Sequence, residues 1–306
     1  MSRKIENLED DVVIRNGKGI QVSYQMHCTM IDGSVANILT GTNASSNCFI
    51  CHAKPTEMNV TNFTKVPIAN HYKYGLSTLH AWIRCFECLL HIAYRLTFKC
   101  WQVRKENKDA FSANKVRIQN EFRTRLGLIV DQVKTGFGTT NDGNTARKFF
   151  SNAEVASEIT GINKELIQNF SIILRLISCG MRINIDAFRE LLIRTRTMYL
   201  TEYEWYYMPS SVHKILMHGC EVIEYFDLPI GNFSEEALEA LHKHIRIVRY
   251  DHTRKTAREH TNRDLMSYLT ISSDPEVVFK KSAIPNKNAV YTMDELEEYL
   301  VDAEET

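Results

Sequence analysis

The chain has 306 residues, of which 44% are hydrophobic, so it can build a sizeable core and does not have the composition of a disordered protein. Its 37 basic residues balance its 37 acidic residues, so only the distribution of charge can argue for a polyanionic partner. Eight cysteines without a charged-then-apolar leader predict a reducing compartment, and no apolar run reaches the ~18 residues of a membrane span. We therefore expect a soluble intracellular protein without a membrane partner.

Residues 12–40 predict β-structure near the N-terminus. Apolar runs at 12–14 and 20–31 flank the turn sequence at 16–19, Asn-Gly-Lys-Gly, which is a strong hairpin signal. The second run alternates apolar and polar residues, which predicts one buried and one solvated face. It ends at Asp32-Gly33. A carboxylate at a strand end is a frequent metal-ligand position in open-sheet enzymes, but ordinary strands also stop at Asp-Gly.

Cys48 and Cys51 form a Cys-x-x-Cys pair that follows a loop rich in Thr, Asn and Ser. A polar loop suits a zinc knuckle because its amide groups can turn toward the thiolates. A redox pair is the alternative, although the strand-to-helix context of a thioredoxin-type motif is missing. A knuckle of this kind supplies half of a four-coordinate zinc shell, so the other two ligands have to come from elsewhere in the chain.

A helical pattern of apolar residues runs from about residue 76 to 130, and it contains a second Cys-x-x-Cys at Cys85 and Cys88. Three-residue spacing inside an apolar helix places two small side chains on one face, so we interpret this pair as core. Residues 95–125 interleave Lys and Arg with aromatic residues. That mixture suits contact with a nucleic-acid backbone, and a solvated helix face has a similar composition.

Residues 136–144 are the segment richest in Gly and Asn and predict a loop, which lacks the Gly-Lys-Ser/Thr ending of a phosphate-binding P-loop. Three helices are predicted after it, at 154–159, 164–178 and 186–203. Asn163 and Asn184 are the expected N-caps of the last two.

His213 and His218 are the candidates for the missing zinc ligands. Residues five apart are separated by about 140° on an ideal helix, so they do not share a face. One of them must lie at a helix start or a bend, which residues 209–211 (Pro-Ser-Ser) can provide. Alone, this pair is more typical of a structural role; together with Cys48 and Cys51, it favours zinc.

A further helix is expected after residue 231, with Ser234 as its N-cap and two acidic residues in its first turn. A core stripe is predicted along it at Leu238, Leu241, Ile245 and Val248. On another face, Glu239 precedes Lys243 and Arg246. A metal-dependent phosphodiester enzyme uses such an acid to hold a cation and such bases to hold phosphates. The alternative is an i, i+4 pair on a solvated face.

Charge is unevenly distributed along the C-terminal part of the chain. Residues 242–263 form a cationic strip that includes Arg249, Arg254 and Lys255. Residues 294–305 are acidic and contain no base, which predicts a short helix with a frayed end.

Six motifs, in order along most of the chain up to about residue 275, together resemble those of Transib transposases and, more distantly, the catalytic subunit of the V(D)J recombinase. They are Met-Ile-Asp-Gly at 30–33, Ser-Asn-Cys-Phe-Ile-Cys at 46–51, Leu-Ser-Thr-Leu-His-Ala-Trp at 76–82, Asn-Asp-Gly-Asn-Thr-Ala-Arg-Lys at 141–148, Met-Pro-Ser-Ser-Val-His-Lys-Ile-Leu-Met-His at 208–218 and Leu-Pro-Ile-Gly-Asn-Phe-Ser-Glu-Glu-Ala-Leu-Glu at 228–239.

The resemblance implies an α+β, mostly helical chain: a partial RNase H-like catalytic core interrupted by a large helical, zinc-bearing insertion. The implied segments are a partial RNase H-like sheet at 1–45, the zinc-binding insertion at 46–227, a catalytic helix and basic segment at 228–275 and an acidic tail at 276–306. Implied activities are DNA nicking and strand transfer with Mg²⁺ or Mn²⁺. Double-stranded DNA as partner, a homodimer and the nucleus follow as expectations.

Individual residues are matched through the motifs. Asp32 corresponds to the family's second acidic metal ligand and Glu239 to the third. His80 corresponds to a histidine near the active site, and Arg147 lies in a shared motif. The resemblance assigns the zinc ligands to Cys48, Cys51, His213 and His218. Lys243, Arg246, Arg249, Arg254 and Lys255 are the further DNA-binding candidates.

Two departures from the family pattern qualify the expected activity. The family's first catalytic Asp lies on a strand upstream of the hairpin, and Asp10 and Asp11 do not stand in its motif. Two carboxylates of three predict an inactive site unless the third is supplied. After Glu239, Leu-His-Lys at 241–243 replaces a basic, Asn-containing turn. Three hypotheses follow: the C-terminal part of a transposase, a truncated or co-opted zinc-stabilised DNA-binding protein, and a decaying fragment that does not fold stably.

Overall fold

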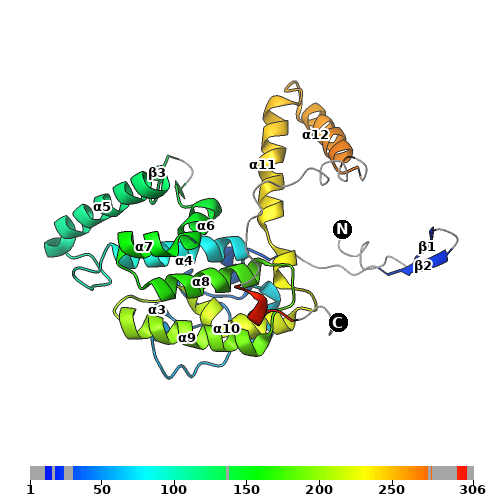
Figure 1. Ribbon diagram of the computed structural model, residues 1–306. Coiled ribbons are helices and arrows are strands. Elements are labelled where there is room, and N and C mark those ends of the chain that lie inside the picture. Colours follow the sequence, from blue (N-terminus) through cyan, green and yellow to red (C-terminus); the bar gives the residue numbers. More distant parts are fainter. Residues whose placement is uncertain are drawn as a thin grey trace.

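A computed structural model of the chain describes residues 11–15, 18–23, 30–135, 138–274, 277 and 295–301. Helices dominate the described residues, and the strands form two small antiparallel pairs (Figure 1). The α+β, mostly helical class predicted from the sequence is therefore confirmed. No helix in the described part of the chain is both long and apolar enough to cross a membrane.

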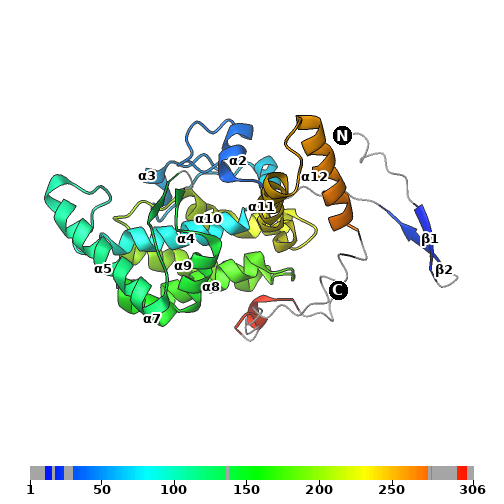
Figure 2. The ribbon, with the colours of Figure 1, turned by 90° about the horizontal axis from the view of Figure 1, so that it is seen from above.

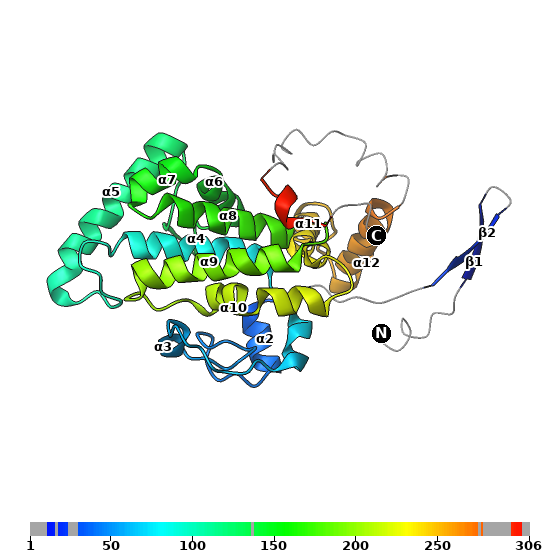
Figure 3. The ribbon, with the colours of Figure 1, turned by 60° about the horizontal axis from the view of Figure 1, so that its bottom comes forward.

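The core is a stack of long helices with α4 near its centre (Figure 3). Helix α4 packs against α6, α8 and α10, and both α8 and α10 also pack against α9. On one side α5, α6 and α7 cover the stack, and on the opposite side lies the segment with α2, α3 and η1. The bounds are α2 Gly33–Leu39, α3 Pro55–Met58, η1 Ala69–Tyr74, α4 Thr78–Ala93, η2 Lys105–Asn107, α5 Lys108–Leu126, α6 Gly143–Ser151, α7 Ala153–Thr160, α8 Lys164–Ser178, α9 Ile185–Tyr203 and α10 Ser210–Tyr225.

Polar side chains set where the core helices begin, as the sequence predicts. Asn163 accepts a hydrogen bond from the Glu165 amide at the start of α8, and Asn184 caps α9 in the same way. These bonds satisfy amide groups that have no partner inside the helix. Cys85 and Cys88 are buried on α4, which confirms their interpretation as core residues.

The N-terminal hairpin is confirmed, but the predicted β-structure at 12–40 is too long. Strand β1 (Asp11–Arg15) pairs antiparallel with β2 (Lys18–Val22), with Arg15 opposite Lys18. Ile20 is exposed, so the described strand has no apolar face against the core. Residues 24–29 of the expected strand lie outside the described residues, and 30–32 are not in a strand, although Met30 is buried. Residues 33–39, expected as β-structure, form helix α2 instead. Alternating apolar side chains become buried only where another surface covers them. The described helical body covers neither strand of the hairpin (Figure 2).

A second short pair, β3 (Val133–Lys134) with β4 (Gly138–Thr139), precedes α6. After α10, the turn η3 (Ile230–Phe233) leads into α11 (Glu236–Asp251), which projects from the body and packs against α12 (Arg258–Ser272) (Figure 1). Because α11 leaves the body, its predicted core stripe is only partly correct: Val248 is buried, whereas Leu238 and Leu241 are exposed.

The part of the acidic tail that is described lies against the body rather than apart from it. It contains the turn η4 (Glu297–Tyr299), and Leu300 pairs with Ile183 in an isolated bridge. Arg175 also forms an ion pair with Glu295, with 2.6 Å between Nη1 and Oε2.

Candidate functional site

The Cys-x-x-Cys loop is a tight turn held by its own backbone. The Cys48 amide donates to the Ala53 carbonyl over 2.9 Å, and the His52 amide donates to the Cys48 carbonyl over 2.8 Å. His52 adopts a φ of 55°, a left-handed conformation that is uncommon for residues other than glycine. The turn directs the buried side chains of Cys48 and Cys51 toward α10.

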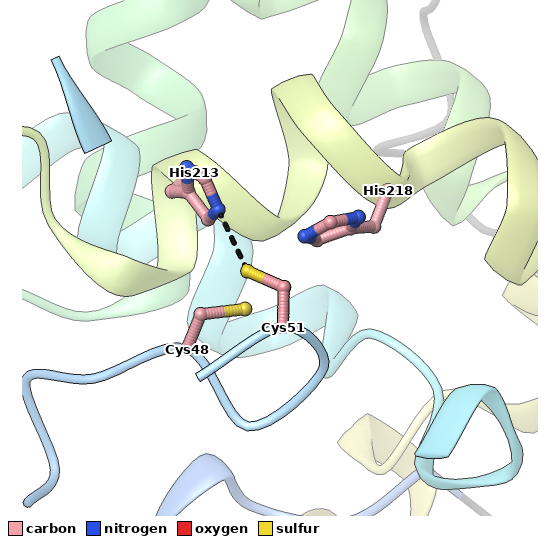
Figure 4. A group of neighbouring side chains, drawn as sticks. All are labelled: Cys48, Cys51, His213 and His218. Carbon is pink, nitrogen blue, oxygen red and sulfur yellow. Dashed lines mark hydrogen bonds between the residues drawn. The ribbon is translucent and has the colours of Figure 1, made fainter. Parts of the chain in front are cut away.

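α10 supplies the two histidines, and all four predicted ligands converge (Figure 4). The ligand atoms of Cys48, Cys51, His213 and His218 lie within 4.8 Å of one another, and all four residues are buried. His213 stands in the first turn of α10, which begins directly after Pro209, as the spacing argument requires. No bend is needed, because the imidazole rings reach Cys51 from two sides of one continuous helix.

The protonation states in this group favour metal coordination. Burial raises the pKa of Cys48, but hydrogen bonds from the Cys51 side chain and backbone, together with the Lys214 charge, outweigh it and bring the pKa to about 7. Burial lowers the pKa of His213, which favours the neutral imidazole. The hydrogen bond between the Cys51 and Cys48 side chains is the principal cause of the raised pKa of Cys51, because it keeps the proton on the Cys51 thiol, and burial acts in the same direction. A bound cation would replace this proton and stabilise both sulfurs as thiolates.

One nitrogen of each imidazole can serve as a ligand atom beside the two cysteine sulfurs. His213 Nε2 lies 3.4 Å from Cys51 Sγ. His218 Nε2 is buried and has no hydrogen-bond partner in the described structure. A buried acceptor without a partner costs free energy, and coordination would satisfy it. The two sulfurs and two imidazoles can therefore hold a metal ion, and this donor set is compatible with zinc.

Asp32 lies next to this loop but begins a helix instead of ending a strand. Its Oδ1 atom accepts a hydrogen bond from the Ser34 amide over 2.5 Å and so caps α2. Although burial raises its pKa, this bond and the nearby charges of His80 and Arg84 hold the pKa of Asp32 below its ordinary value. The carboxylate is therefore ionised at neutral pH.

His80 connects Asp32 to a second carboxylate, that of Glu235. Its Nε2 lies 3.2 Å from Asp32 Oδ2, and its Nδ1 lies 3.3 Å from Glu235 Oε1 and 2.7 Å from Ser77 Oγ. The hydrogen bond to Glu235 is the main reason that the pKa of His80 is raised, with the Asp32 charge acting in the same direction. The Ser77 hydroxyl also donates to Glu235. A protonated His80 thus bridges two carboxylates.

Glu235 is the site residue that sequence reasoning missed. It is only 6% exposed, and its second oxygen, Oε2, has no hydrogen-bond partner in the described structure. Despite burial, the bonds from His80 and Ser77 lower its pKa, so it stays ionised. The sequence marks it only as an acid in the first turn after Ser234, the expected N-cap, a position that favours the helix dipole. The structure corrects this: α11 begins at Glu236 with Glu235 in the N-cap position, and Ser234 Oγ accepts a hydrogen bond from the Glu236 amide. No spacing signal separates Glu235 from its neighbour Glu236.

Glu239, the acid matched by motif, lies elsewhere. It is exposed on α11, about one turn beyond Glu235, and lines a different recess that contains Arg147, Lys243 and Arg246. The structure therefore brings together Asp32 and His80 as predicted but places Glu235, not Glu239, beside them. Tertiary packing of η3 against the body buries the start of α11 and leaves the next turn in solvent.

The predicted DNA-binding residues divide into two groups. Arg147 pairs with Glu236 and stacks over Trp82, 5.4 Å from the ring centre, and it shares its recess with Lys243 and Arg246. Further along, Arg249 is exposed on α11, Lys255 donates to its carbonyl, and Arg254 Nη2 lies 2.7 Å from Asp264 Oδ1. The first group lines a concave surface; the second holds the turn between α11 and α12.

A separate recess of about 370 Å³ opens beside Asp32 and His80. Its wall also includes Arg84 on α4 and Lys214 on α10.

Comparison with protein-family models and with curated proteins finds no match for this chain. The function has to be argued from the geometry.

Proposed function

We propose that the chain is the C-terminal portion of a Transib-like DNA transposase or recombinase, a family that nicks DNA and transfers strands with divalent metal ions. It is built on a partial RNase H-like core and is inactive alone, because the family's first catalytic Asp is missing. The observation that carries this proposal is the Asp32–His80–Glu235 cluster, in which two ionised carboxylates face one imidazole beside a recess of about 370 Å³. Glu235 takes the place of Glu239 in the proposal because of its contacts and its burial.

The residues present fit a divalent cation. Glu235 Oε2 is a buried carboxylate oxygen without a hydrogen-bond partner in the described structure, which is unfavourable unless a cation or water satisfies it. Hard cations such as Mg²⁺ and Mn²⁺ prefer carboxylate oxygens. When bound, such cations supply Lewis-acid activation of water or a 3′-hydroxyl and stabilise the phosphate charge. Asp32 and Glu235 contact opposite nitrogens of the His80 ring, so each would offer its carboxylate to a separate cation, and His80 orients both.

In this proposal, zinc bound to Cys48, Cys51, His213 and His218 has a structural role. The loop that carries the two cysteines begins a few residues after α2, the helix that Asp32 caps, and α10 leads through η3 to Glu235. Joining this loop to α10 therefore fixes both carboxylates relative to each other. A closed shell of four protein ligands is typical of structural zinc and leaves no open position for catalysis.

The proposed substrate is double-stranded DNA. Arg147, Lys243 and Arg246 line one recess, and their positive charge suits phosphate contacts along a duplex. From the resemblance to Transib transposases we also propose that the chain forms a homodimer that acts in the nucleus.

Manganese binding tests the assignment of the acids. We expect the chain, loaded with zinc, to bind Mn²⁺ as followed by electron paramagnetic resonance, and Asp32→Asn or Glu235→Gln to weaken binding about tenfold or more. Glu239→Gln is the matched control, since it removes a carboxylate one turn away. Weaker binding in the control alone would restore Glu239 as the ligand and contradict the proposed role of Glu235.

A second candidate is a zinc-stabilised DNA-binding protein without cleavage activity. The protonated His80 favours it, because an imidazolium between two carboxylates already neutralises much of their charge without a metal. Incubation of the purified chain with terminal-repeat DNA and Mn²⁺ tests this candidate. This candidate predicts no nicking; robust nicking that Glu235→Gln abolishes would exclude it.

A further inference from the structure

The recess beside Asp32 is cationic at the end that the acidic cluster does not occupy. Lys214 and Arg84 both line it. Arg84 pairs through Nη1 with Glu87 over 2.8 Å and keeps its other N–H donors, whereas Lys214 forms no ion pair with a carboxylate of the described residues. Lys214 is half-buried, and its ammonium group lies beside Gly33, which also lines the recess, with the nitrogen 3.4 Å from where a Cβ on that residue would stand. Within the described chain this group faces the Phe49 ring, 4.3 Å from its centre, rather than an acceptor oxygen. A cation held in this way retains hydrogen-bond donors for a ligand.

The start of α10 opens into the same recess. Pro209, Ser210 and Ser211 line it, and Pro209, the residue that precedes the helix, provides no side-chain cap. The first intrahelical bond runs from the His213 amide to the Pro209 carbonyl over 2.9 Å. The amides of the first three helical residues therefore have no acceptor inside the helix. Lys214 follows Ser210 by four residues, so its side chain lies on the same face as this start.

We propose that this recess is a phosphate-binding subsite, formed by Lys214, Arg84 and the uncapped start of α10, and that it holds a backbone phosphodiester of DNA next to Asp32. A helix N-terminus joined by a lysine and an arginine combines orphan amides, a partial positive charge and two full charges. The choice of DNA rests on the proposed function. The phosphate chemistry itself does not, because inorganic phosphate presents the same oxygens.

Two variants remove different parts of the subsite. Lys214→Gln removes the charge while keeping most of the side-chain length. Ser210→Pro removes one amide N–H at the first helical position, where proline is well tolerated, so the helix is expected to remain. Lys73→Gln is the matched control, because Lys73 is an exposed lysine on η1, which also packs on α10. Thermal unfolding and zinc content are measured for all three.

Inorganic phosphate tests the subsite without DNA. We expect titration with phosphate to shift the amide resonances of Ser210 and Ser211, and each of the two subsite variants to weaken binding about tenfold. The control should bind as the original chain does. Absent binding, or equal binding in all variants, would overturn the proposal. Loss of zinc in Lys214→Gln with normal phosphate binding in Ser210→Pro would overturn the role of Lys214 and assign it to the Cys48 thiolate.

A duplex tests the source of the phosphate. Measured by fluorescence anisotropy without added divalent cations, Lys214→Gln should lower the slope of log affinity against log salt by about 0.9, the value for one lost B-DNA phosphate contact. Ser210→Pro should weaken binding without changing the slope, because an amide carries no full charge. Normal duplex binding by variants that have lost phosphate binding would overturn DNA as the occupant. Nicking is not used as a readout, so an inactive acidic cluster does not affect the outcome.

Discussion

His80 Nε2 lies 3.2 Å from Asp32 Oδ2, and this contact joins the Met-Ile-Asp-Gly segment at 30–33 to the first turn of α4. On its other side the same ring contacts Glu235, from a segment more than 150 residues further along the chain. The His80 imidazole therefore links Asp32 and Glu235, two acids that lie far apart in the sequence and each contact this ring.

This link predicts a specific pH dependence of stability. The pKa of His80 is raised above 6.5, so its contribution is fully present below the unfolded-state pKa and is lost as pH rises through the folded pKa. The free energy of unfolding of the original chain should exceed that of His80→Gln by about 1 kcal/mol near pH 6, and by less at higher pH. Urea denaturation over a pH series measures the difference.

Asp32 and Glu235 set the lower pH limit of this stabilisation. The pKa values of Asp32 and Glu235 are lowered, so their stabilising contribution is present above the unfolded-state values and is lost as pH falls through the folded ones. A difference between the two chains that stays constant from pH 5.5 to about 8.5 would contradict the raised pKa of His80.

Metal removal should separate the two Cys-x-x-Cys pairs. Cys51→Ser or His218→Ala should release one metal ion per chain and lower stability by at least about 2 kcal/mol, since metal bound only to the folded state stabilises it. Cys85→Ala is the control: this buried core residue should lower stability through a small cavity and leave metal content unchanged. Elemental analysis and thermal unfolding provide both measurements. Equal metal content in all variants would contradict the assignment.

Gly231 is predicted to be essential for placing Glu235. A Cβ atom at this position would lie 2.1 Å from the backbone oxygen of Cys179, so η3 has to shift away from α8. Gly231→Ala should therefore destabilise the chain by about 1 to 3 kcal/mol and weaken Mn²⁺ binding. At Gly41, where a Cβ would meet nothing within 4 Å, alanine has only the strain of a positive φ to overcome. Denaturant midpoints compare the two, and a smaller effect at Gly231 would contradict the close packing.

The recess on α6 and α11 that contains Lys243 and Arg246 should contribute to DNA affinity independently of cleavage. Lys243→Gln and Arg246→Gln should each lower the salt dependence of duplex binding by about one phosphate contact. Arg254→Gln is expected to have a smaller effect, because two hydrogen bonds of 2.7 and 3.0 Å engage its guanidinium group with Asp264. Anisotropy titrations at several salt concentrations test the order. An equal loss for Arg254→Gln would place the duplex across the turn between α11 and α12.

Local chemistry explains why much of the helical framework follows from sequence. The bounds predicted for α8 are those observed, because Asn163 gives a clear start and apolar spacing gives the period. Apolar spacing likewise places Cys85 and Cys88 in the core. The Asn-Gly-Lys-Gly turn predicts the hairpin, whose described strands are 11–15 and 18–22. Alternation also predicts a buried face, but it states only which side chains share a face and not what covers that face.

The sequence by itself determined α8 and α9 with their caps at Asn163 and Asn184, and the four residues that form the candidate metal group, because residue type and local spacing carry that information. Only the tertiary structure decided which acid meets Asp32 and His80. Glu235 and Glu239 are one helical turn apart and chemically alike, and the packing of η3 buries the first while α11 carries the second into solvent. Burial depends on contacts between distant segments, which local spacing does not encode.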